Sequence, residues 1–140
     1  MPKKLNSPRK KLTGQELRNL DLEIQFLEGI VRRDADYVEA LQILGDDYTS
    51  RGRYAEGLKI DERLSKLRPE DSLVHYNLAC SYSLTERLDQ ALESLEIALD
   101  LGYRDFKWMA EDPDLGNLRE HAAYKKKIQA KVRQMRMQPR

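Results

Sequence analysis

The side chains that could carry acid–base, nucleophilic or metal chemistry are scattered along this 140-residue sequence. The one cysteine, Cys80, has no histidine or cysteine near it, and His75 and His121 are isolated. A lone cysteine is more often buried and inert than reactive, and isolated histidines do not make a metal site. The paired acids Asp46-Asp47 and Asp61-Glu62 occupy adjacent helical positions, which point apart. We therefore predict no enzymatic activity, no catalytic residue, no metal and no cofactor.

Charge is unevenly distributed although the net charge is only +1. Residues 1–20 sum to +5 and residues 119–140 to +7, whereas the stretch between them sums to −11. The basic ends fit a nucleic acid or an acidic partner. They also fit a solvated outer face on a terminal helix, which repeat proteins require. We prefer the solvated face for residues 119–130 and leave both interpretations open for the tails.

The composition favours helices and an intracellular location. Gly and Pro are few, 7 and 5, while 40% of residues are hydrophobic and 35% charged. A single cysteine cannot form an internal disulfide. The first 14 residues are too polar for a signal peptide, and no apolar run approaches the roughly 18 residues of a membrane helix. We expect a cytoplasmic protein without membrane contact.

The sequence repeats with a period of 34 residues. The positions that coincide are apolar or small: Leu44 with Leu78, Gly45 with Ala79, Tyr48 with Tyr82, Gly57 with Ala91, Leu58 with Leu92, and Leu67 with Leu101. Apolar residues at helical spacing lie on both sides of Gly52, which suits a left-handed residue closing a helix. Pro69 then ends the unit. Gly45, having no side chain, predicts a close approach of two helices. The pattern indicates an all-α chain of helix-turn-helix units.

These units resemble the tetratricopeptide repeat, whose period is also 34 residues. The residues that carry the resemblance are Leu41, Leu44, Gly45, Tyr48, Gly52, Tyr54, Gly57 and Pro69, then Leu78, Ala79, Tyr82, Ala91 and Ala98. The resemblance implies an α-α superhelix of such repeats with a C-terminal capping helix. Two positions depart from the family pattern. His75 stands in place of a large apolar residue, and Tyr103 in place of the closing proline.

The repeat register divides the chain into segments. We expect a disordered basic tail at 1–12 and a single domain at 13–136, followed by a tail at 137–140. Within the domain the register gives a half-repeat helix at 13–35, repeats at 38–71 and 72–105, and a closing segment with a capping helix at 106–136.

Local signals support these boundaries. Thr13 and Glu16 form a capping box, and Asp112 followed by Pro113 marks another helix start. The closing segment resembles that of many bacterial tetratricopeptide proteins. Its last helix, at roughly 117–136, has an apolar stripe of Tyr124, Ile128, Val132 and Met135.

In tetratricopeptide arrays the first helix of each repeat lines a concave groove where ligands lie. The resemblance therefore implies, by register, these partner-binding residues: Glu39, Gln42, Asp46, Leu73, Tyr76, Asn77, Cys80 and Leu84. Tyr76 is the expected anchor, because aromatic residues carry much interface energy. One family subtype grips a carboxylate, but Asp46 would repel such a ligand. For Glu39 and Asp46 a merely solvated face is an equally good interpretation, and the closing helix is an alternative occupant of the groove.

Three functional hypotheses follow. The first is a non-enzymatic scaffold that binds a peptide or helix of another protein in the groove. The second is a nucleic-acid-associated or acidic-partner-binding factor that uses the basic terminal segments. The third is self-assembly through the terminal helices, and the chain is accordingly expected to be a monomer or a weak homo-oligomer. Salt separates the first two, because phosphate-driven binding weakens steeply with ionic strength.

Overall fold

The computed structural model describes residues 11–138, and every regular element in that range is helical. In chain order the elements are α1 (Gly14–Arg33), α2 (Val38–Ser50), α3 (Tyr54–Leu67), α4 (Ser72–Leu84), α5 (Leu88–Asp100), α6 (Phe106–Glu111), the short 3₁₀ helix η1 (Pro113–Leu115), α7 (Gly116–Arg119), the π-helix η2 (Tyr124–Gln129) and α8 (Ala130–Met137). The predicted all-α class is confirmed. The tail predicted at 1–12 falls outside the described residues except for Lys11 and Leu12, and so does the end of the tail predicted at 137–140.

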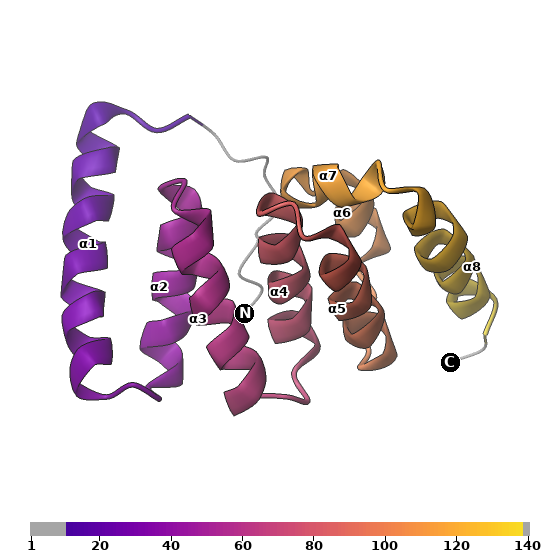
Figure 1. Ribbon diagram of the computed structural model, residues 1–140, viewed down its shortest axis with the longest axis horizontal. Coiled ribbons are helices and arrows are strands. Elements are labelled where there is room, and N and C mark those ends of the chain that lie inside the picture. The colour runs from indigo at the N-terminus through magenta and orange to yellow at the C-terminus, as the bar shows by residue number, and fades with distance from the viewer. Residues whose placement is uncertain (1–10, 139–140) are drawn as a thin grey trace.

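The five long helices are α1 to α5, and each of the first four packs against the helix that follows it in the chain. Figure 1 shows them side by side in a row, with α1 at one end and α8 at the other. The core is correspondingly divided. Ile24 and Leu44 belong to a cluster between α1 and α2, whereas Leu41, Leu64 and Val74 join α2, α3 and α4. The largest cluster holds α4 and α5 together with the closing segment that follows Asp100.

The turns of the backbone repeat with the 34-residue period. Gly52, at the end of α2, has a φ of 84°, the left-handed conformation predicted for it. Glu86, one period later, has a φ of 60° although it is not a glycine. At both turns the next amide donates to a carbonyl five residues back: Arg53 N to Tyr48 O at 2.8 Å, and Arg87 N to Tyr82 O at 2.8 Å. Such a bond closes a helix end around a left-handed residue.

A side-chain contact repeats with the same period. The Tyr48 hydroxyl donates to Glu28 on the preceding helix at 2.5 Å, and the Tyr82 hydroxyl donates to Glu62 at 3.0 Å. Each tyrosine thus ties the first helix of its unit to the helix before it. The sequence period therefore corresponds to a structural period in both the backbone and the contacts between helices.

Small residues set the distance between paired helices. A Cβ atom on Gly57 would lie 3.0 Å from Thr49 Oγ1 and 3.5 Å from the carbonyl oxygen of Gly45, so α2 and α3 touch at these glycines. Ala91, one period after Gly57, is fully buried in the cluster that joins α4 and α5. The prediction that Gly45 and Ala91 lie where helices touch is confirmed.

The ends of the domain were predicted with different success. The capping box at the start of α1 is confirmed: Glu16 N donates to Thr13 Oγ1 at 3.1 Å, and Thr13 N donates to Glu16 Oε1 at 2.9 Å. The continuous helix predicted at roughly 117–136 is wrong, because α7 ends at Arg119 and the chain bends before η2 begins at Tyr124. His121 stabilises the bend, since its Nδ1 accepts from Ala123 N at 3.0 Å.

The apolar stripe of the last helix nevertheless faces inward. Tyr124, Ile128 and Val132 are buried in the largest cluster, and Met135 packs against it. The bend and the following π-helical turns place these residues on α5 and the closing segment. No helix among residues 11–138 combines the length and apolarity needed to cross a bilayer.

Candidate partner-binding groove

The predicted anchor Tyr76 lies in the core. Its side chain is 1% exposed, and its ring stacks on that of Tyr103 with centroids 4.3 Å apart. Its hydroxyl donates to Asp112 Oδ2 at 2.7 Å, and the Cys80 thiol points to the same oxygen at 3.7 Å. Burial, followed by the neighbouring Cys80 and Asp112, raises the pKa of Tyr76, which therefore remains a hydrogen-bond donor. Tyr76 and Cys80 are both buried in this conformation, and the prediction that they contact a partner stays a prediction.

The closing segment covers these residues. η1 and α7 pack on α4, and both Leu115 and Leu118 are fully buried there. Asp112 starts η1, as predicted, with its Oδ1 accepting from Asp114 N at 2.9 Å. Leu118 N donates to Ser83 Oγ at 3.2 Å, so the segment is also bonded to the C-terminal end of α4. The alternative occupant that was predicted, the last helix, does not lie on α4; residues 112–119 of the closing segment cover α4 instead.

The first unit remains open. A cavity of about 480 Å³ lies between α1, α2, α3 and α4. Its lining is Glu23, Glu39, Gln42, Ile43, Asp46, Asp47, Asp61, Leu64, Asp71, Leu73, Val74 and Asn77, which we call the acidic groove. Five of the eight predicted site residues belong to it: Glu39, Gln42, Asp46, Leu73 and Asn77. Tyr76, Cys80 and Leu84 do not.

Six of the twelve lining residues are acidic, and they differ in their bonding. Asp71 caps α4, accepting from Leu73 N at 2.9 Å. Asp61 Oδ2 accepts from Ser81 Oγ at 2.5 Å. Glu23 and Glu39 are exposed at the rim. Cations could therefore approach Glu39, whereas Glu23 is hydrogen-bonded to Asp47, and Asp61 and Asp71 already hold the fold together.

Asp47 has the most perturbed carboxyl group of the groove. It is 8% exposed, and its buried Oδ2 accepts no hydrogen bond from an N–H or hydroxyl group of the described residues. Burial, then the hydrogen bond and charge of Glu23, raises the pKa of Asp47 to about 8. Asn77, also 8% exposed, presents a second buried oxygen, Oδ1, that has no such partner. Two acceptors, one on α2 and one on α4, thus lack donors.

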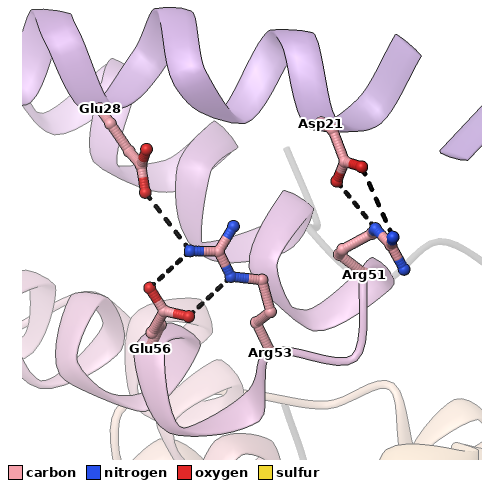
Figure 2. Close-up of polar contacts among 5 residues, drawn as sticks. All are labelled: Asp21, Glu28, Arg51, Arg53 and Glu56. Carbon is pink, nitrogen blue, oxygen red and sulfur yellow. Dashed lines mark hydrogen bonds and ion pairs between the residues drawn. The ribbon is translucent and has the colours of Figure 1, made fainter. Parts of the chain in front are cut away.

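Neighbouring acids outside the groove are neutralised by arginines. Figure 2 shows Arg51 bound to Asp21, and Arg53 between Glu28 and Glu56. The closest N–O distances are 2.8 Å for Arg51–Asp21, 2.6 Å for Arg53–Glu56 and 3.6 Å for Arg53–Glu28. These contacts attach α1 to the turn between α2 and α3. Both arginines are therefore engaged in the fold.

The sequence did not reveal several groove residues. The repeat register placed Asp46 but not Asp47 on the groove, yet the cavity extends far enough around α2 to include both. Glu23 comes from the half-unit helix α1, which a rule about first helices does not cover. The position of Glu23 on the helix directly before the predicted lining helix α2 could have identified it as a groove residue.

The C-terminal cations are partly used within the fold. Lys131 forms an ion pair with Asp100 at 2.7 Å, and the Arg136 guanidinium lies 5.3 Å from the centre of the Phe106 ring. Lys125, Lys126 and Lys127 are exposed.

Two further observations bear on the remaining hypotheses. Leu22 and Phe26 on α1 are 65% and 68% exposed, so the N-terminal helix has an uncovered apolar face. No group of three or more potential ligands that could hold a metal occurs among residues 11–138.

Comparison with known proteins relates the chain to part of a larger plant protein. No family model matches the chain. Over 112 residues, 76% of its length, the chain is 40% identical to a chloroplastic protein of Arabidopsis thaliana. The chain spans about a third of that protein's length, 32%.

Proposed function

We propose that this chain is a tetratricopeptide-type interaction module that binds a segment of another protein in the acidic groove and catalyses no reaction. The observation that carries the proposal is the open cavity of about 480 Å³ among four helices, with unpaired buried acceptors beside apolar side chains. Cavities of this size, roughly 300–1,000 Å³, are typical of ligand sites. Its half-open form suits an extended peptide or one face of a helix.

The repetition of structure supports the tetratricopeptide assignment. The turn hydrogen bonds and the tyrosine–glutamate contacts recur at an offset of 34 residues. Stacked units of this kind give extended concave surfaces, which is how repeat proteins bind. The similarity to the chloroplastic protein covers only about a third of that protein, so its other parts supply no argument about this chain. The cytoplasmic location remains a prediction.

Site-specific photocrosslinking tests the proposal. A photoreactive phenylalanine derivative replaces Ile43, which lines the groove and is 46% exposed. The matched control replaces Ile97 on α5, which is 37% exposed and outside the groove. In extracts of the native host, we expect a discrete protein crosslinked at position 43 and not at position 97.

The rival hypothesis is tested in the same experiment. A third variant carries the photoreactive residue at Lys126, among the exposed C-terminal lysines. Crosslinking to nucleic acid or protein at position 126 alone would assign binding to the basic end and refute the groove. Equal yields at positions 43 and 97 would indicate non-specific contact.

A further inference from the structure

Every titratable group that lines the acidic groove is a carboxyl group. Glu23 lies on α1, Asp46 and Asp47 on α2, and Asp61 on α3, while α4 contributes Asp71 and the amide of Asn77. The nearest arginines bind other acids, Arg51 at Asp21 and Arg53 at Glu56. Arg63 donates to the carbonyl of Ala35 at 2.7 Å and pairs with Asp36. An anionic ligand would be repelled, and a cationic one would be attracted from several sides.

Two buried oxygens specify the kind of ligand more closely. Asp47 Oδ2 and Asn77 Oδ1 both accept no hydrogen bond from an N–H or hydroxyl group of the described residues, and both side chains are more than nine-tenths buried. The protonated Asp47 carboxyl group instead shares a hydrogen bond with the Glu23 carboxylate. Buried polar atoms are nearly always paired, and leaving one unpaired is unfavourable. Once Asp47 has lost its proton, both atoms are acceptors, so the missing group is a donor. They come from α2 and α4, so a donor between the helices has acceptors on two sides.

The remaining lining is apolar. Ile43, Leu64, Leu73 and Val74 contribute hydrocarbon surface next to the acids. Lysine and arginine combine a hydrocarbon stem with a charged head, and they bury the stem along apolar surface. A small inorganic cation would leave this surface in water.

We propose that the acidic groove is a receptor site for the cationic side chain of a partner peptide, an arginine or lysine whose head group donates to Asp47 and Asn77 and whose stem lies on Ile43, Leu64 and Leu73. The proposal rests on the proposed function and names the chemistry of its partner. A guanidinium, with five N–H donors in a plane, can bond acceptors on two helices at once.

The protonation of Asp47 gives the site a measurable signature. Because its pKa is raised to about 8, the carboxyl group carries a proton at neutral pH. The cation replaces that proton at the carboxyl group, and the proton passes to the solvent. The groups facing Asp47 from α1, α2, α3 and α4 are acidic or neutral, so none of them supplies a competing positive charge. Binding should release protons near pH 7 and strengthen as the pH rises to 8.

Peptide selection tests the proposal against the full-length chain. A phage-displayed library of random peptides is panned on the wild type. The selected peptides that also crosslink to the variant with the photoreactive residue at position 43 are sequenced. We expect one position to be enriched in arginine or lysine. A synthetic fluorescent version of the best peptide is then compared with a twin in which the neutral isostere citrulline replaces that residue, and the twin should bind about tenfold or more weakly.

Variants locate the contact. Asp47→Asn and Asn77→Leu should each weaken the basic peptide about tenfold. Glu93→Gln makes the same carboxyl-to-amide change at an exposed position on α5 and should change affinity less than about twofold. If Asp47→Asn does not fold, as judged by circular dichroism, Glu39→Gln at the rim replaces it with a smaller expected loss. Calorimetry in two buffers of different ionisation enthalpy should detect proton release in the wild type and none in Asp47→Asn.

The outcomes separate this proposal from the proposed function. Enriched peptides without a preferred basic residue, or equal binding of the citrulline twin, would overturn the cation site and leave a peptide-binding groove. A second chain carries glutamine in place of the five basic residues before Leu12. If neither the wild type nor this second chain enriches any peptide, both the cation site and the peptide-binding groove are overturned. Basic peptides that bind only that second chain would support the site and show that the N-terminal cations compete for it.

Discussion

The contact between Tyr76 and Asp112 should be a principal attachment of the closing segment to the repeats. Tyr76 OH donates to Asp112 Oδ2 at 2.7 Å, both side chains are 1% exposed, and the two residues are 36 positions apart. The other oxygen of Asp112 caps η1. Tyr76→Phe removes only the hydroxyl, and Asp112→Ala removes the acceptor and the cap together.

The geometry fixes the expected magnitudes. Tyr76→Phe leaves a buried carboxyl oxygen with only the Cys80 thiol nearby, which should destabilise the fold by about 1–3 kcal/mol. Asp112→Ala removes the carboxylate acceptor of a buried hydroxyl, about 1–3 kcal/mol, and a cap worth roughly 0.5–2 kcal/mol. The double variant should be less destabilised than the sum of the two, by about 1–2 kcal/mol.

Urea denaturation of the four proteins measures these values. Circular dichroism reports the helices, and fluorescence of Trp108, the single tryptophan, reports α6 in the closing segment. Tyr82→Phe is the control, because its hydroxyl also donates to a carboxylate, Glu62 at 3.0 Å, but in a partly exposed position. It should cost less than about 1 kcal/mol. A Tyr76→Phe variant as stable as Tyr82→Phe, or a coupling energy near zero, would refute the assigned role of this contact.

Three further predictions concern the groove and the helices. Because the pKa of Asp47 is raised from 3.8 to about 8, the folded chain holds a proton that the unfolded chain releases above pH 4. The contribution of this proton to stability is full below pH 4 and is lost as the pH rises through 8. Urea denaturation from pH 5 to 8.5 should therefore show a steeper decline in unfolding free energy for the wild type than for Asp47→Asn. Ala91→Leu should lower the unfolding free energy in urea by roughly 1–3 kcal/mol through overpacking between α4 and α5, and an unchanged midpoint would contradict the buried placement of Ala91. Thr13→Ala should cost about 1 kcal/mol by removing the cap of α1, and hydrogen exchange should show the loss of protection confined to the first turn near Glu16.

The features that follow from local pattern could be predicted from the sequence. A left-handed residue at Gly52 and the capping box at Thr13 depend on neighbours within a few positions. Contact positions such as Gly45 and Ala91 depend on the repeat, because a period in sequence imposes a period in packing. Each of these predictions concerns a unit or its immediate neighbour, which is the range over which repeat structures are determined.

The placement of Tyr76 depends on a segment that lies outside the repeats. Its partner Asp112 belongs to the closing segment, which the register treats as an end and not as a lining. A rule that places the first helix of each repeat on an open surface holds only where nothing else packs on that helix. The aromatic ring, the thiol and the apolar neighbours that favoured a binding site are the same properties that favour burial by Leu115 and Leu118.

The covering of α4 changes which partner the groove can accept. If the apolar surface of the second unit had remained open, an apolar anchor beside a polar segment would have been the matching ligand. The closing segment contributes that anchor itself, with Leu115 and Leu118 already buried in place. The acidic groove of the first unit remains open. An apolar group buried there would leave the oxygens of Asp47 and Asn77 without donors. An unpaired buried acceptor offsets the gain from hydrophobic burial. In the proposed site a partner would therefore gain most affinity by inserting a positively charged donor, because the closing segment of the chain already covers the apolar surface of the second unit.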